Sequence, residues 1–145
     1  MNNWQRIFAY ISASLVLGMA LILLTNSFLQ YISNEGTTGY LFLMGFGLVY
    51  LNINFGISRR FVIKAIRLDW VCYLITILTI APTLFWVFTK DTGLGESQLE
   101  FVIAAVFSAF LGTYFGIRRG TVKREQYLQQ LREEGEEVPD SLRSY

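Results

Sequence analysis

The sequence predicts an all-α integral membrane protein, a four-helix bundle of transmembrane helices, on three observations. Apolar residues make up 53% of the 145 residues and charged residues only 16%, whereas a soluble domain averages roughly 25% charged residues. Charged residues are absent from four long stretches, 7–34, 36–58, 70–89 and 101–117. About 20 apolar residues in a helix cross a membrane core about 30 Å thick, and these stretches do not alternate in polarity as barrel strands would.

The first predicted span covers residues 7–31. Arg6 before the apolar run and the small residues Gly18-Met19-Ala20 also suit a secretory signal with a cleavage site. The apolar run continues through Leu24, beyond the point where a signal would end. We therefore expect this helix to stay in the mature protein.

The second and third spans are predicted at 38–57 and 70–89. Pro82 in the third removes a backbone donor and predicts a kink. The fourth span, 101–117, has small residues at every fourth position, which lets another backbone approach one helical face closely. These helix-packing residues are Ala104, Ser108, Gly112 and Gly116. The neighbour is either the second helix or another subunit, and we favour the second helix because a four-helix protein needs such faces to pack.

A membrane domain at 1–117 is thus followed by a charged tail at 118–145. Residues 118–134 are rich in helix formers and could prolong the fourth helix, although Gly120 weakens the junction by about 1 kcal/mol relative to alanine. Gly135 and Pro139 are expected to end that helix.

A short motif occurs twice, sixty residues apart: Phe55-Gly56-Ile57 before Arg59, and Phe115-Gly116-Ile117 before Arg118. One interpretation is two tandem helical hairpins, as in some transporters. The other is that any apolar helix ending at the cytoplasmic face finishes with small and basic residues.

The basic residues predict the orientation. With four crossings, eleven of the twelve lie on one side, and only Lys90 lies on the other. Because basic residues are retained in the cytoplasm, both termini are predicted to be cytoplasmic, and a bacterial plasma membrane suits the compact four-span form.

Two sets of residues are candidate sites. Basic residues at the cytoplasmic loop suit an anionic lipid or an acidic partner, or simply enforce the topology; they are Arg59, Arg60, Lys64 and Arg67. Neutral polar residues in the spans either hydrogen-bond between helices or line a path for an ion or polar solute; they are Asn26, Asn52, Asn54, Thr76, Thr79 and Thr83.

The sequence offers no catalytic set, metal-ligand spacing or phosphate-binding loop, and it has no histidine to serve as a haem ligand. We therefore expect neither an enzyme nor a cofactor, and a net charge of +1 does not favour nucleic-acid binding. Two functions remain. The favoured one is a non-catalytic accessory, assembly or scaffold subunit with a membrane-protein partner or a second copy of itself, and the alternative is a small oligomeric channel or facilitator.

Overall fold

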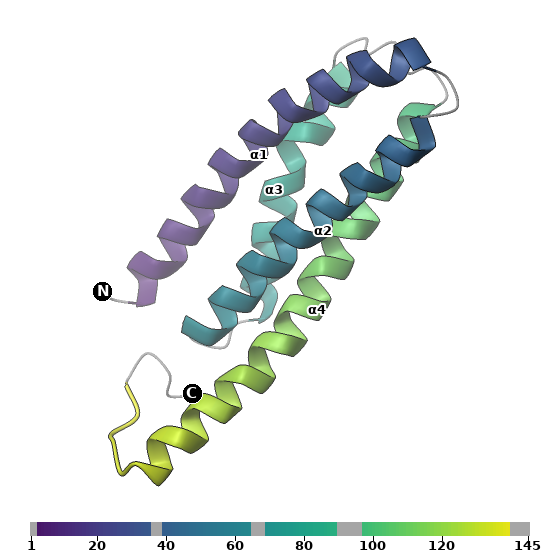
Figure 1. Cartoon of the computed structure of the whole chain (residues 1–145). Helices are drawn as coiled ribbons and strands as arrows, with labels where there is room; N and C mark the ends of the chain where they lie inside the picture. The colour runs from purple at the N-terminus through teal and green to yellow at the C-terminus, as the bar shows by residue number, and fades with distance from the viewer. Residues whose placement is uncertain (1–2, 36–38, 65–68, 90–96, 140–145) are drawn as a thin grey trace.

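The computed structural model describes residues 3–35, 39–64, 69–89 and 97–139. These residues form α1 (Asn3–Glu35), α2 (Gly39–Lys64), α3 (Asp69–Thr89) and α4 (Ser97–Glu133), joined in that order (Figure 1). No strand occurs in the described ranges. The all-α prediction is confirmed.

Three of the helices are long and apolar enough to cross a membrane, over Trp4–Leu24, Asp69–Thr89 and Leu99–Glu133. α2 is not among these three, and its C-terminal half contains Asn52, Asn54, Arg59 and Arg60.

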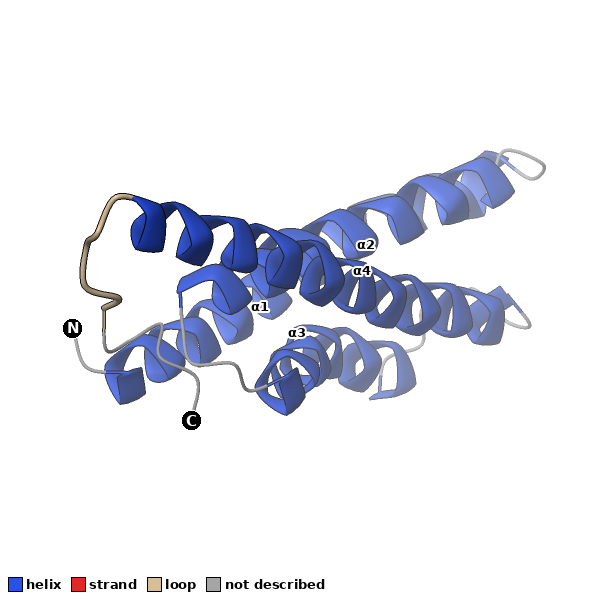
Figure 2. Cartoon of the chain, turned by 90° about the horizontal axis from the view of Figure 1, so that it is seen from below, coloured by secondary structure: helices blue, strands red, loops and turns tan. Residues whose placement is uncertain are grey.

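The helices pair in an order that differs from their order in the chain. α2 packs most extensively against α4, and α1 packs mainly against α3, whereas α1 and α2 make few contacts although they are consecutive. Both views show α4 alongside α2 (Figures 1 and 2), and Figure 1 shows its C-terminal end reaching beyond the other helices.

Two apolar clusters hold the helices together. One combines all four helices and includes Leu21, Phe46, Tyr50, Ile80 and Phe101. The other joins the C-terminal half of α2 to the start of α3 and contains Phe61, Val62, Val71, Cys72 and Ile75. Tyr10 of α1 meets this second cluster, its ring 5.3 Å from that of Phe61 in an edge-to-face contact.

α1 lies very close to α3 beside Pro82. A Cβ atom on Gly18 would lie 2.9 Å from the Thr79 carbonyl oxygen and 3.0 Å from Pro82 Cγ. Proline cannot donate to the carbonyl four residues earlier, here Leu78, whose oxygen also lies beside Gly18. The proline and the glycine therefore form one packing feature.

α4 continues without a break from the apolar region into the charged one. Gly120 lies inside it and is buried against α2, where an added Cβ would meet the Arg59 carbonyl oxygen at 3.0 Å. Gly135 adopts a positive φ of 72°, and the amides of Gly135 and Glu136 donate to the carbonyls of Arg132 and Leu131. This is the Schellman arrangement that ends helices.

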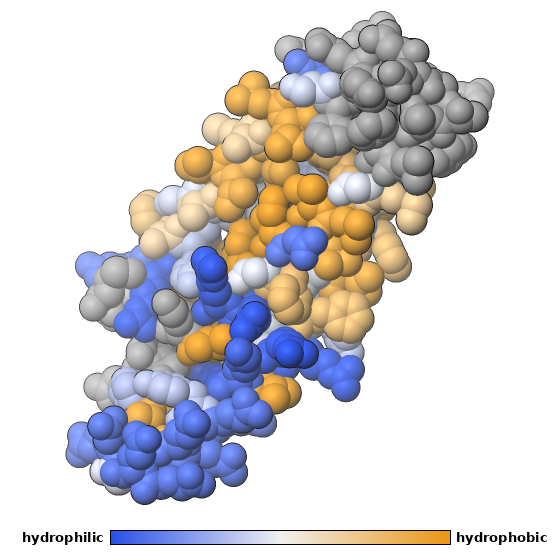
Figure 3. Space-filling view, in the orientation of Figure 1, coloured by the Kyte–Doolittle hydropathy of each residue, from blue (hydrophilic) through white to orange (hydrophobic). Residues whose placement is uncertain are grey.

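The surface is divided by polarity along the long axis. Hydrophobic residues cover the upper part of the face in Figure 3, and hydrophilic residues gather at the lower end, where α4 finishes. Many large apolar side chains are exposed on the described helices, among them Phe8, Met19, Phe85 and Phe107. Such a surface is typical of helices surrounded by lipid.

Candidate functional site

The small residues of α4 face α2. An added Cβ on Gly116 would lie 2.6 Å from the Phe55 carbonyl oxygen, one on Gly112 would collide with the Leu51 backbone, and one on Gly47 would lie 2.9 Å from Ser108 Oγ. Ala104 is farther away, with its carbonyl oxygen 4.0 Å from the Gly47 position. The face therefore serves contact within the chain.

The two copies of the Phe-Gly-Ile motif have different surroundings. Gly116 lies against the α2 backbone, but a Cβ on Gly56 would meet nothing within 4 Å. A two-fold relation between tandem hairpins would place the two glycines in equivalent contacts. The resemblance in sequence does not extend to the packing.

The threonines of the polar set point into the protein. Thr76, Thr79 and Thr83 are all buried on α3. The Tyr50 hydroxyl donates to Thr83 Oγ1 at 2.7 Å, Thr76 shares a hydrogen bond with Thr113 of α4, and Thr79 donates to the Ile75 carbonyl at 2.8 Å. The first two contacts join α3 to α2 and α4, and the third lies within α3.

The three asparagines do not join the threonines in a single lining. Asn26 and Asn52 are exposed, and Asn52 donates to the Leu48 carbonyl at 2.9 Å. Asn54 is buried and donates to the Tyr50 carbonyl at 2.9 Å, while its Oδ1 atom has no partner among the described residues. Of the predicted polar residues, Asn26 is thus on the surface of α1 and Asn52 on that of α2, while the others are in the interior.

The predicted basic set is only partly described. Arg59 is half-buried and Arg60 is exposed near the end of α2. The side chain of Lys64 and the whole of Arg67 lie outside the described residues.

The role of Arg124 was not predicted from the sequence. Its side chain is 4% exposed, and its Nη1 donates to the Val62 carbonyl at 2.9 Å. Val62 lies in the last turn of α2, where helical carbonyls lack partners within the helix. Arg124 therefore caps α2 from α4. Its position continues the four-residue spacing of Gly112, Gly116 and Gly120, which is the signal that could have predicted this contact.

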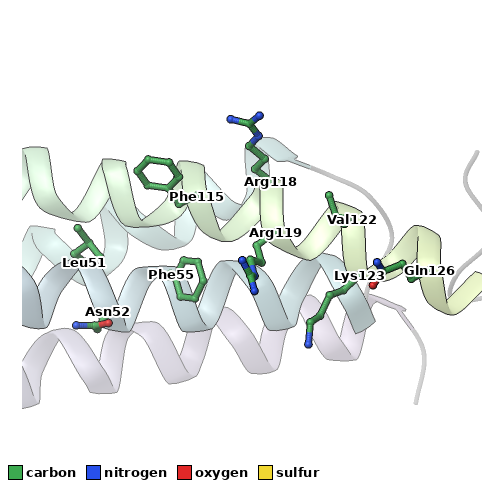
Figure 4. Close-up of a pocket in the computed structure, with 9 residues that line it drawn as sticks. All are labelled: Leu51, Asn52, Phe55, Phe115, Arg118, Arg119, Val122, Lys123 and Gln126. Atoms are coloured by element: carbon green, nitrogen blue, oxygen red, sulfur yellow. The ribbon is translucent and has the colours of Figure 1, made fainter.

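A groove of about 800 Å³ runs along the flank of the α2 and α4 pair (Figure 4). α2 contributes Leu51, Asn52 and Phe55. α4 contributes aromatic, basic and neutral side chains, namely Phe115, Arg118, Arg119, Val122, Lys123 and Gln126. Phe55 and Phe115 lie toward one end, and Lys123 and Gln126 lie toward the other. This groove was not predicted from the sequence, because its shape depends on how α2 and α4 pack, and these helices are far apart in the chain.

The described residues bring no three His, Cys, Asp or Glu side chains together as a metal site, and the cysteine, Cys72, is buried. Comparisons with protein families, curated proteins and solved structures gave no match.

Proposed function

We propose that this protein is a non-catalytic integral membrane protein that acts as an accessory, assembly or scaffold subunit of a membrane complex. The observation that supports the proposal is that polar residues of the core hydrogen-bond between helices. Tyr50, Thr76, Thr83 and Thr113 hydrogen-bond to one another across helices, which suits a packing role and leaves them poorly placed for contact with a solute.

In the proposed arrangement all four helices cross a bacterial plasma membrane, with both termini in the cytoplasm. The distribution of basic residues supports this orientation. The polar end of α4, which extends past the other helices (Figure 1), would then lie in the cytoplasm and be the part most accessible to a partner.

Affinity purification of the full chain in mild detergent, followed by mass spectrometry, tests the proposal. A membrane protein should co-purify in fixed ratio, and Tyr127→Asp, on an exposed part of the α4 extension, should reduce its recovery. Phe107→Leu, on an exposed apolar part of the same helix, is the matched control. A chain that always purifies without a partner would refute the proposal.

The alternative is a small oligomeric channel or facilitator for an ion or a neutral polar solute. Exposed Asn26 and Asn52 favour it, because an oligomer could gather them around a shared path. Reconstituted vesicles test it directly, since a channel must give flux that Asn52→Leu reduces. Absence of flux in every lipid composition would eliminate this alternative.

A further inference from the structure

The groove between α2 and α4 changes in polarity along its length. Phe115 stands at its apolar end. With a helical rise of 1.5 Å per residue, Arg119 lies about 6 Å and Lys123 about 12 Å farther along the axis. Leu51 and Phe55 of α2 line the same groove. Apart from Asn52, the end of the groove away from Lys123 is apolar, and it leads into a cluster of positive charge.

The cations of the groove are available to a ligand. Arg118, Arg119 and Lys123 are exposed, and no described carboxylate forms an ion pair with them. Arg119 and Lys123 are four residues apart, a spacing at which like charges destabilise a helix. Arg124 differs, because it is buried and donates to the Val62 carbonyl. A bound anion would relieve the repulsion.

We propose that this groove binds a phospholipid with an anionic headgroup. The phosphate lies between Arg119 and Lys123, and an acyl chain lies along Phe55 and Phe115. The inference rests on the membrane placement proposed above and is independent of the subunit role.

The position of the groove favours a lipid over a peptide or a soluble anion. Phe115 belongs to the fourth predicted span, at membrane depth, where the backbone of a docked peptide would leave polar groups without partners. A soluble anion would use the basic end and leave the apolar end unoccupied. A phospholipid of the cytoplasmic leaflet presents its chains and its phosphate in the same order as the groove.

Native mass spectrometry of the full chain in detergent tests the proposal with dioleoyl phosphatidylglycerol and dioleoyl phosphatidylcholine as probes. Phosphatidylglycerol should bind more tightly than phosphatidylcholine. The Arg119→Gln/Lys123→Gln variant should lose about thirtyfold in affinity for phosphatidylglycerol, because two cations near an anionic headgroup are removed. Arg119→Lys with Lys123→Arg keeps both charges and should retain most of the binding.

The matched control for a single Arg119→Gln substitution is Arg132→Gln, which removes one exposed charge outside the groove. Its affinity should stay close to that of the unsubstituted protein, and an equal loss would overturn the proposal in favour of general surface attraction. Phe115→Ser should weaken phosphatidylglycerol binding. Three results would overturn the lipid proposal. Inorganic phosphate could compete fully with phosphatidylglycerol, or phosphatidylcholine could bind equally well. The third is that Arg119 and Lys123 hold an acidic protein in place of lipid. Co-purification of a membrane partner is measured separately, so failure of one proposal leaves the other standing.

Discussion

A single missing Cβ atom decides how closely two helices of this protein approach. Gly116 has the Phe55 carbonyl oxygen and the Ser58 Cβ atom at 2.6 and 3.0 Å from the position of an added Cβ, whereas Gly56 has no neighbour within 4 Å. The sequence around the two glycines is nearly the same. The sequence therefore predicted that small residues would face a helix. Whether a given glycine is in close contact depends on which helix lies opposite it.

This difference makes Gly116→Ala and Gly56→Ala a matched pair. Gly116→Ala should destabilise the folded protein by about 1–3 kcal/mol, because the extra methyl group forces the helices apart. Gly56→Ala should be neutral or stabilising by up to about 1 kcal/mol, since alanine favours helix over glycine. Unfolding by SDS in mixed micelles measures both, and equal effects would contradict the described packing of α2 against α4.

Arg124 provides a second test at the level of one side chain. Arg124→Met keeps much of the apolar stem and removes the donor to the Val62 carbonyl. We expect a loss of about 1–3 kcal/mol, the cost of leaving a buried acceptor unsatisfied. Hydrogen exchange should also become faster at the end of α2. Arg132→Met, at an exposed position, should leave both properties unchanged; a similar change there would argue against a capping role.

The helices were the most predictable part of this protein. The predicted third span, 70–89, differs by one residue from α3 (Asp69–Thr89), because charged residues flank a charge-free run. The fourth span was predicted at 101–117 with a prolongation over 118–134, and α4 does continue to Glu133. Its continuation through Gly120 costs little because that glycine lets α2 approach. Amino-acid composition alone does not show that close packing against α2 offsets the low helix propensity of Gly120.

At the level of elements, α1 is held to α3 at one close approach. Gly18→Val should weaken this pairing, because its side chain would overlap the Thr79 carbonyl and the Pro82 ring. Gly45→Val is the control, since a Cβ there meets nothing within 4 Å. Cysteine pairs engineered between α1 and α3 should cross-link less in the first variant and normally in the second. Normal cross-linking in both would contradict the contact.

For the whole molecule, the sequence favoured the second helix as the neighbour of the fourth, but it did not predict that α1 pairs with α3. Short loops predict that consecutive helices are neighbours, yet α2 packs mainly against α4, and α1 against α3. The four-residue stripe on α4 indicated a buried face, for which the second helix was favoured over another subunit. The α2 and α4 groove exists only as a result of this pairing, so no single segment could have predicted it.

The orientation in the membrane is a prediction for the whole chain. A reporter that is active only in the cytoplasm should be active when fused after Tyr145 and silent when inserted in the segment 90–98, because basic residues concentrate on the side of the two termini. Exchanging the reporter for one that is active only outside the cytoplasm should reverse the pattern. Activity of the same reporter at both sites would contradict the proposed topology.

The pairing of α2 with α4 also bears on how the protein is made. Synthesis runs from the N-terminus, so α4, the principal partner of α2, leaves the ribosome only after α3. Before α4 is made, residues 51–59 of α2 cannot pack against Gly112, Gly116 and Gly120. The Val62 carbonyl also lacks its hydrogen bond from Arg124. The pairing of α2 is therefore completed only once α4 has been synthesised through Arg124.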